Sequence, residues 1–165
     1  MLIYHGTYMQ ILQPEILRSE IGRDFGFAFY TTDIREQAER WAVRKAKIQS
    51  RRMRKTIQPI VNIYDWNEQN DRVKVKTFSD ASMEWLEMVM HCRSDIKYSH
   101  PYDIVVGKIA DDNVGETVSY VMQGIMRKED AVERLRFEKI NNQIAFCTVA
   151  SLSELTFCLS YIVGE

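Results

Sequence analysis

The sequence predicts an α+β domain whose sheet is mostly antiparallel, and three observations lead to this fold class. The expected elements follow in the order strand, strand, helix, strands, helix, strand, two helices, strand, helix, without the strict alternation of a doubly wound parallel sheet. Apolar residues recur with the strand period in some segments and the helix period in others. The chain has 165 residues, of which 45% are hydrophobic, so one core over residues 1–165 is expected to form a single domain.

The N-terminal half begins with a short expected strand at residues 2–6, followed by a loop that carries Pro14 and Gly22. The aromatic-rich stretch at residues 25–31 predicts a second strand. Asp33, with Glu36 three residues later, is typical of a helix start. The apolar spacing then predicts a helix to about Gln49, fraying over residues 51–55.

The rest of the chain is expected to alternate strands and helices. Residues 57–66 predict a strand, and Pro59 favours an edge position; residues 73–77 predict another with one solvated face. A helix around Trp85 is expected to begin at Ser79 or Asp80, and a buried strand follows at residues 104–106. Two helices around residues 118–126 and 131–135 and a strand at residues 144–148 come next. Ser151 and Glu154 form the pattern of a capping box and predict a last helix.

Composition and charge narrow the kinds of partner and compartment. The formal net charge is -1, which gives no general reason to expect nucleic acid or a membrane. Three cysteines without a C-x-x-C pair indicate free thiols and a reducing compartment. No signal-peptide pattern and no run of about 20 apolar residues occurs, so we expect a cytoplasmic protein without membrane contact.

Common catalytic and binding signatures are absent from the sequence. It has no phosphate-binding G-x-x-x-x-G-K-[ST] or G-x-G-x-x-G motif and no H-E-x-x-H zinc motif. The adjacent pair His91-Cys92 would be a poor chelate, because neighbouring residues on a helix point about 100° apart. We therefore expect no metal site.

Three short blocks remain that could form a site: Tyr4-His5-Gly6-Thr7, the run from Asp24 through Phe25 to Tyr30, and Asn141-Asn142-Gln143 with the strand after it. In order and spacing they resemble the three motif strands of the ADP-ribosyltransferase fold, in the branch marked by a His-Tyr-Glu triad. The resemblance is strongest to an uncharacterised bacterial family, domain of unknown function 3990, and covers nearly the whole chain. It implies a split, mostly antiparallel sheet flanked by helices.

The resemblance also implies a role for each matching residue toward NAD, the substrate. His5 would hydrogen-bond a ribose hydroxyl, and Gly6 would hold the nicotinamide amide with its backbone. Tyr30 would stack on the nicotinamide ring, and Gln143 stands where the family carries a glutamate. Thr7, Asp24 and Phe25 would contribute to the same pocket.

Gln143 departs from the family pattern in a way that bears on catalysis. Cleavage of the nicotinamide–ribose bond develops positive charge on the sugar, which a carboxylate would stabilise. A glutamine can still hydrogen-bond the ribose, but loss of one preorganised electrostatic contact costs about 2.7–4 kcal/mol of barrier. Modification of the poly-ADP-ribose type is therefore disfavoured.

Each of these residues also has a structural interpretation. His5 could be a satisfied histidine at a strand end, and Tyr30 could belong to the core with the phenylalanines around it. Asp24 could brace the loop before the second strand, and Gln143 could be a polar strand residue on a solvated face. Trp41 and Trp85 are expected in the core.

The leading hypothesis is a mono-ADP-ribosyltransferase of bacterial or phage-conflict type that passes ADP-ribose to a protein or nucleic-acid acceptor. It could be a toxin paired with an antitoxin encoded nearby. Two alternatives remain open: a non-catalytic module that binds NAD, a nucleotide or a partner, and an NAD hydrolase with water as acceptor.

Overall fold

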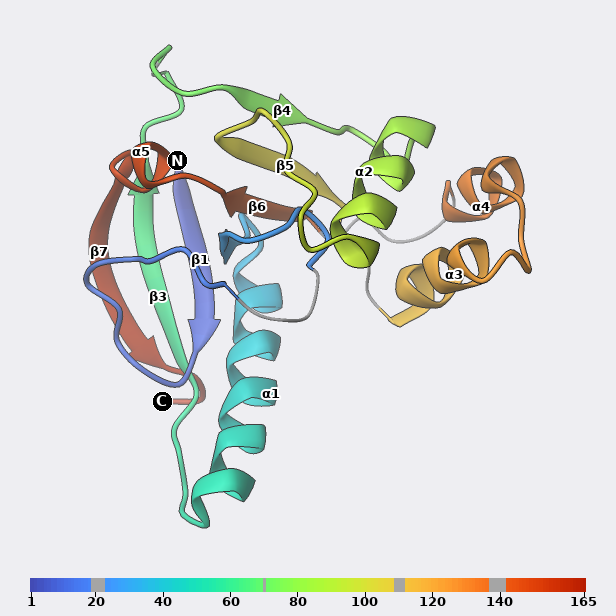
Figure 1. Ribbon diagram of the computed structural model, residues 1–165. Coiled ribbons are helices and arrows are strands. Elements are labelled where there is room, and N and C mark those ends of the chain that lie inside the picture. The colour runs from blue at the N-terminus through green and yellow to red at the C-terminus, as the bar shows by residue number, and fades with distance from the viewer. Residues whose placement is uncertain (19–22, 70, 109–111, 137–141) are drawn as a thin grey trace.

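A computed structural model describes residues 1–18, 23–69, 71–108, 112–136 and 142–165 (Figure 1). Gly22 and Asn141, which belong to the predicted loop and the third block, lie outside the described residues, as do Ala110 and Asp111. The described part of the chain contains these elements in order: β1 (Leu2–Thr7), β2 (Phe29–Thr31), α1 (Arg35–Met53), β3 (Ile60–Trp66), β4 (Val75–Thr77), α2 (Met83–Ser94), β5 (Ile104–Lys108), α3 (Asp112–Met122), α4 (Lys128–Leu135), β6 (Asn142–Phe146), α5 (Val149–Leu152) and β7 (Leu155–Ile162).

The strands form two sheets, in the orders β1-β3-β7 and β2-β6-β5-β4. Each neighbouring pair is antiparallel except β4 and β5, which are parallel. The predicted α+β class with a mostly antiparallel sheet is therefore confirmed. No helix in the described residues combines the length and apolarity needed to cross a membrane.

In the described part of the chain, a backbone bridge joins the two sheets between Tyr4 of β1 and Thr32, the residue after β2. The Tyr4 N–H donates to the Thr32 carbonyl at 2.8 Å, and the Thr32 N–H donates back at 3.0 Å. Beyond this bridge β1 and β2 diverge, and His5, Gly6 and Thr7 follow on β1. The sheets therefore separate at the point where the first motif begins.

Helix α1 packs across β1, and Gly6 makes this packing possible. A Cβ on Gly6 would lie 1.9 Å from the Ala38 carbonyl oxygen and 2.8 Å from the Ala42 amide nitrogen. Ala38 and Ala42 are fully buried against Val61 of β3. Small residues on both elements thus let the helix backbone approach the strand closely.

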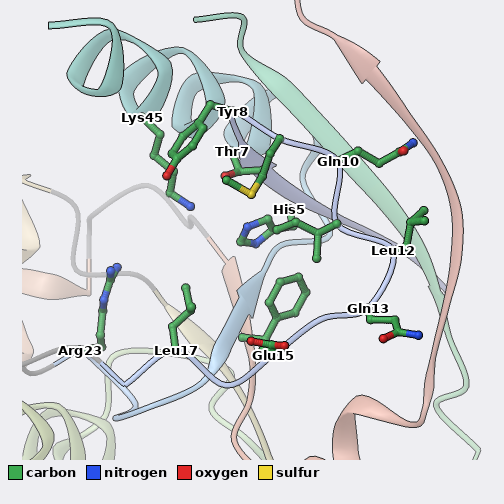
Figure 2. A pocket seen from close by; sticks show the side chains of 13 residues that line it. His5, Thr7, Tyr8, Gln10, Leu12, Gln13, Glu15, Leu17, Arg23 and Lys45 are labelled. Atoms are coloured by element: carbon green, nitrogen blue, oxygen red, sulfur yellow. The ribbon is translucent and has the colours of Figure 1, made fainter. Parts of the chain in front are cut away.

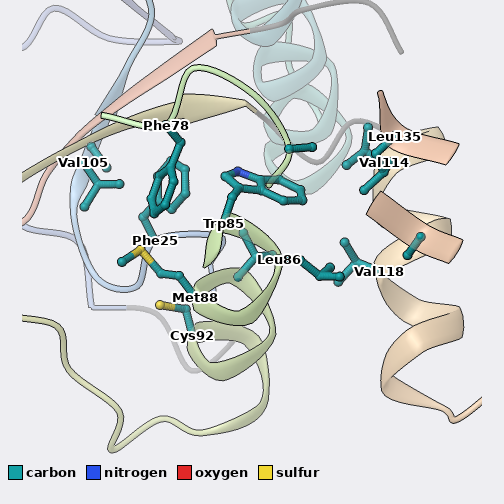
Figure 3. Close-up of a cluster of buried hydrophobic side chains, with 14 of the residues drawn as sticks. Phe25, Phe78, Trp85, Leu86, Met88, Cys92, Val105, Val114, Val118 and Leu135 are labelled. Carbon is teal, nitrogen blue, oxygen red and sulfur yellow. The ribbon is translucent and has the colours of Figure 1, made fainter. Parts of the chain in front are cut away.

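The larger core lies between the four-stranded sheet and helices α2, α3 and α4 (Figure 3). Trp85 is fully buried at its centre, as predicted, and its indole N–H donates to the Lys108 carbonyl at 3.2 Å. Val118 and Leu135 approach it from the outer helix pair. Burial of a large aromatic side chain such as this one contributes several kcal/mol to folding.

The predicted last helix is wrong. The capping box is made by Thr148 and Ser151 and starts only the four-residue helix α5. Leu155–Ile162 then forms β7, an eight-residue strand paired with β3. Its sequence, LTFCLSYI, alternates apolar and other residues with the strand period, and that alternation outweighed the cap-like residues before it.

Three smaller expectations are also corrected. Pro59 does not mark an edge strand, because β3 is central in its sheet and the proline precedes the paired residues. Helix α1 runs to Met53, and its start has no side-chain cap because Ile34 occupies the N-cap position. Asp33, one residue earlier, accepts from Asn142 at 3.1 Å. Helix α2 begins after Ser82, whose hydroxyl accepts from the Trp85 amide.

Replacement of Gly6 by alanine should strongly destabilise the protein, because the new methyl group meets backbone atoms of α1 that cannot move independently. We expect a loss of at least about 1–3 kcal/mol in the free energy of unfolding, measured by urea denaturation. Gly115→Ala is the matched control: its Cβ would meet only the Arg93 side chain at 3.9 Å, and in helix α3 it should be neutral or stabilising. Equal stability of the two variants would contradict this account.

Candidate functional site

Two adjoining pockets open where the sheets separate. The first, of about 490 Å³, is lined by His5, Thr7 and Phe29 and by the loop after β1. The second, of about 420 Å³, is lined by Tyr30, Trp41 and Gln143 among others. Arg23 and Lys45 line both pockets. The structure therefore brings the three predicted motif residues to one divided cleft.

His5 lies at the centre of the first pocket, with Lys45 and Arg23 at one end of the view and Leu12 and Gln13 at the other (Figure 2). Its ring stacks on Phe29 with centroids 4.4 Å apart. Its Nδ1 lies 2.6 Å from the Tyr30 carbonyl oxygen. These contacts hold the ring in one orientation.

The environment of His5 selects the neutral ring. Burial, followed by the charge of Lys45, lowers the pKa of His5 to about 3. Since a carbonyl can only accept, Nδ1 must carry the proton in that hydrogen bond. Nε2 is then a hydrogen-bond acceptor, the arrangement that a ligand hydroxyl needs.

Tyr30 is tied by its hydroxyl and offers its ring. The hydroxyl donates to the Gly26 carbonyl at 2.5 Å and accepts from the Phe25 amide at 3.2 Å. The ring is partly buried against the larger core, and the Arg23 guanidinium lies 5.9 Å from its centroid. A planar cation or a planar ligand ring could occupy that side of the ring.

Gly6 presents its backbone to the separation between the sheets. Successive residues of a strand direct their N–H and C=O groups to opposite edges, so Gly6 faces the same edge as Tyr4, which pairs toward β2. Its carbonyl accepts from the Lys45 ammonium at 2.8 Å. A carbonyl has two lone pairs and can accept a second donor.

Lys45 was not singled out from the sequence, although it lines both pockets and shares the first with His5. Burial, and then the charge of Arg23, lowers the pKa of Lys45 to about 8. Trp41, predicted to be core, is only partly buried and lines the second pocket with Arg44 and Ile48. The spacing 41, 44, 45, 48 is that of one helix face, but such a stripe by itself does not distinguish a pocket wall from a core face.

Gln143 and Asp24 form one buried polar cluster. The Gln143 amide donates to Asp24 Oδ2 at 3.4 Å, and Arg93 of α2 donates to Oδ1 through Nε at 2.8 Å and through Nη2 at 2.5 Å. Asp24 is not among the residues that line either pocket. Its contacts favour the bracing interpretation and orient the Gln143 side chain.

Phe25 does not reach the cleft with its side chain. It is fully buried in the larger core, where its ring stacks on Phe78 with centroids 6.3 Å apart. Thr7 lines the first pocket with His5. Among the described residues, no group of three or more side chains could hold a metal ion.

The fold and the cleft together define an α+β domain with a candidate ligand site between two separating sheets. The cleft offers the fixed acceptor of His5, aromatic side chains and cations; the aromatic residues are Phe29, Tyr30 and Trp41, and the cations are Arg23, Arg44 and Lys45. The chain belongs to the family described as Protein of unknown function (DUF3990), whose model matches residues 1–157. No curated protein and no solved structure matches the chain.

The low pKa of His5 makes the protein less stable in mild acid. The unfolded histidine titrates near 6.5 and the folded one near 3, so between these values the unfolded state binds more protons. The contribution of His5 to the free energy of unfolding is therefore fully present above about pH 6.5. It is lost as the pH drops toward 3, by several kcal/mol in total. Urea denaturation at pH 7 and 4.5 should show a smaller pH effect for His5→Gln than for the wild type. His91→Gln is the control at an exposed histidine and should retain the full effect.

Proposed function

We propose that the protein binds NAD in the divided cleft and transfers ADP-ribose to a macromolecule, as a mono-ADP-ribosyltransferase of the His-Tyr branch. The observation that carries this proposal is the fixed, neutral His5, hydrogen-bonded to the Tyr30 carbonyl, with the Tyr30 ring in the adjoining pocket. The separation of two mostly antiparallel sheets at the first motif supports an ADP-ribosyltransferase-like fold.

The charge and shape of the cleft support a dinucleotide as ligand. Arg23, Arg44 and Lys45 bring positive charge to the second pocket and to its border with the first. NAD carries two linked phosphates, so such a border is a favourable place for the middle of the molecule. The two pockets on either side would each take one end.

The cleft residues would act mainly by orienting NAD. His5 Nε2 would accept from a ribose hydroxyl, the Gly6 backbone would hold the nicotinamide amide, and the Tyr30 ring would stack on the nicotinamide. Arg23 lies over the Tyr30 ring, so it must move aside for that stack to form. Orientation of this kind can supply a large part of a rate enhancement.

The transfer step breaks the bond between ribose C1′ and the nicotinamide nitrogen. The bonding electrons stay with the nicotinamide, which leaves as the neutral base, and the acceptor nucleophile forms the new bond to C1′ and releases its proton. Gln143 would hydrogen-bond the ribose without supplying charge. Asp24 does not replace that charge, because Arg93 neutralises it.

A binding module that lacks turnover is the second candidate, and the Gln143–Asp24–Arg93 cluster favours it. A glutamine held by a salt-bridged aspartate is a stable arrangement that needs no catalytic explanation. NAD hydrolysis, with water as the acceptor, differs from transfer only in its product. That the protein is paired with an antitoxin remains a proposal, and the genes adjacent to its own would test it.

Gln143→Glu separates a weak enzyme from a binding module. If the cleft is that of a transferase, restoring the carboxylate should raise nicotinamide release by about 100–1,000-fold. Nicotinamide is measured by chromatography, and free or protein-linked ADP-ribose by mass spectrometry, after incubation with NAD. Gln143→Asn is the uncharged control and should not gain activity. If neither the wild type nor the Glu variant releases nicotinamide but both still bind NAD, the protein is a binding module and not a transferase.

Tyr30→Ala should weaken NAD binding by at least about tenfold in calorimetry, since stacking on an aromatic face contributes about 1–3 kcal/mol. Tyr30→Phe keeps the ring and loses only the bonds to Gly26 and Phe25, so it should bind NAD nearly as the wild type does. Absence of NAD binding by the wild type would refute the proposed function as a whole.

A further inference from the structure

Helix α1 carries an unusual concentration of positive charge in its second half and just beyond. Residues 40–55 contain eight of the chain's 22 lysines and arginines and no Asp or Glu, although the formal net charge of the chain is -1. These cations are Arg40, Arg44, Lys45, Lys47, Arg51, Arg52, Arg54 and Lys55. We call residues 40–55 the basic segment.

The basic segment is accessible and its charge is not neutralised locally. All of its cations except the half-buried Lys45 are exposed. Within the described residues, none of these eight cations takes part in an ion pair. Figure 1 shows the last turns of α1 extending beyond the end of β1. An anionic partner could therefore approach them without displacing another part of the described chain.

One face of the basic segment continues the wall of the second pocket. At about 100° per residue, the pocket residues Trp41, Arg44, Lys45 and Ile48 are followed on the same face by Arg52, with Arg51 on its flank. From Arg40 to Arg52 the helix rises about 18 Å at 1.5 Å per residue. A nucleic-acid strand presents several phosphates over such a length.

The aromatic side chains decide which anion fits best. The partly buried rings of Trp41 and Tyr30 line the same pocket as the cations. The face of an aromatic ring is electronegative and disfavours carboxylates, whereas nucleobases stack on it readily. Bases are free to stack in this way when the strand is unpaired.

We propose that the basic segment, together with the second pocket, binds single-stranded nucleic acid. The phosphates lie along Arg44, Arg51 and Arg52, and a base enters the pocket beside Trp41. That the bound strand also serves as the acceptor of ADP-ribose rests on the proposed function; the binding of the strand does not.

The test measures binding of a fluorescent single-stranded oligonucleotide by anisotropy, without NAD and over a range of salt concentrations. Arg51→Glu/Arg52→Glu removes two cations that lie outside both pockets. This variant should bind at least about tenfold more weakly, and the slope of log affinity against log salt should fall by about 1.4, at about 0.7 per phosphate contact. Lys97→Glu/Arg134→Glu makes the same charge change at exposed residues on and near other helices and should bind as the wild type does.

Two further ligands test which class of anion the basic segment prefers: a duplex of the same sequence and a polyglutamate peptide of equal charge. Both are expected to bind more weakly than the single strand. The proposal is overturned if polyglutamate or the duplex binds as tightly as the single strand, or if the two double variants lose affinity equally. Thermal unfolding and NAD calorimetry of Arg51→Glu/Arg52→Glu should match the wild type, which separates this result from a failure of the fold or of the proposed function.

Discussion

The hydrogen-bonded bridge between β1 and the residue after β2 is the constraint on which the rest of the cleft depends. Two backbone hydrogen bonds join Tyr4 to Thr32, and the His5 side chain adds a third link to the Tyr30 carbonyl. Beyond these bonds the strands separate, and each belongs to a different sheet. These few bonds set where the two sheets part and therefore where the pockets open.

Helix α1 serves both the fold and the cleft through two adjoining faces of its surface. Its alanines pack on β1 and β3, where Gly6 leaves room for the helix backbone. Another face brings Trp41, Arg44 and Lys45 to the second pocket. The position of the cations is therefore tied to the core: a shift of the helix on β1 would displace both Lys45 and its hydrogen bond to Gly6.

The electrostatics of the cleft distinguish its two ends. His5 is kept neutral by burial and by the nearby Lys45, so it can accept a hydrogen bond over the whole physiological pH range. At the other end, the acid nearest to Gln143 is already paired with Arg93. The cleft thus offers positive charge and hydrogen bonds suited to an anionic ligand. In the proposed transfer reaction, Gln143 would supply no charge to stabilise a sugar cation.

Much of the fold and part of the site follow from local sequence patterns. The strands around His5 and Ile104, the helix around Trp85 and the α+β class were all predicted correctly, because their apolar periodicity reflects contacts that each element makes by itself. The family was also predicted, from the order and spacing of the motif blocks. The last strand was not predicted, because the cap-like pair Ser151 and Glu154 favours a helix over the alternation that follows.

Long-range packing decided the remainder. The sequence by itself determined which residues could bind through their side chains, since His5, Tyr30 and Gln143 carry suitable groups in recognisable blocks. Only the tertiary structure showed that Phe25 turns into the core, that Asp24 pairs with Arg93, and that Lys45 lies beside His5. These contacts join residues far apart in the chain, and their burial and charge depend on neighbours that no local pattern specifies.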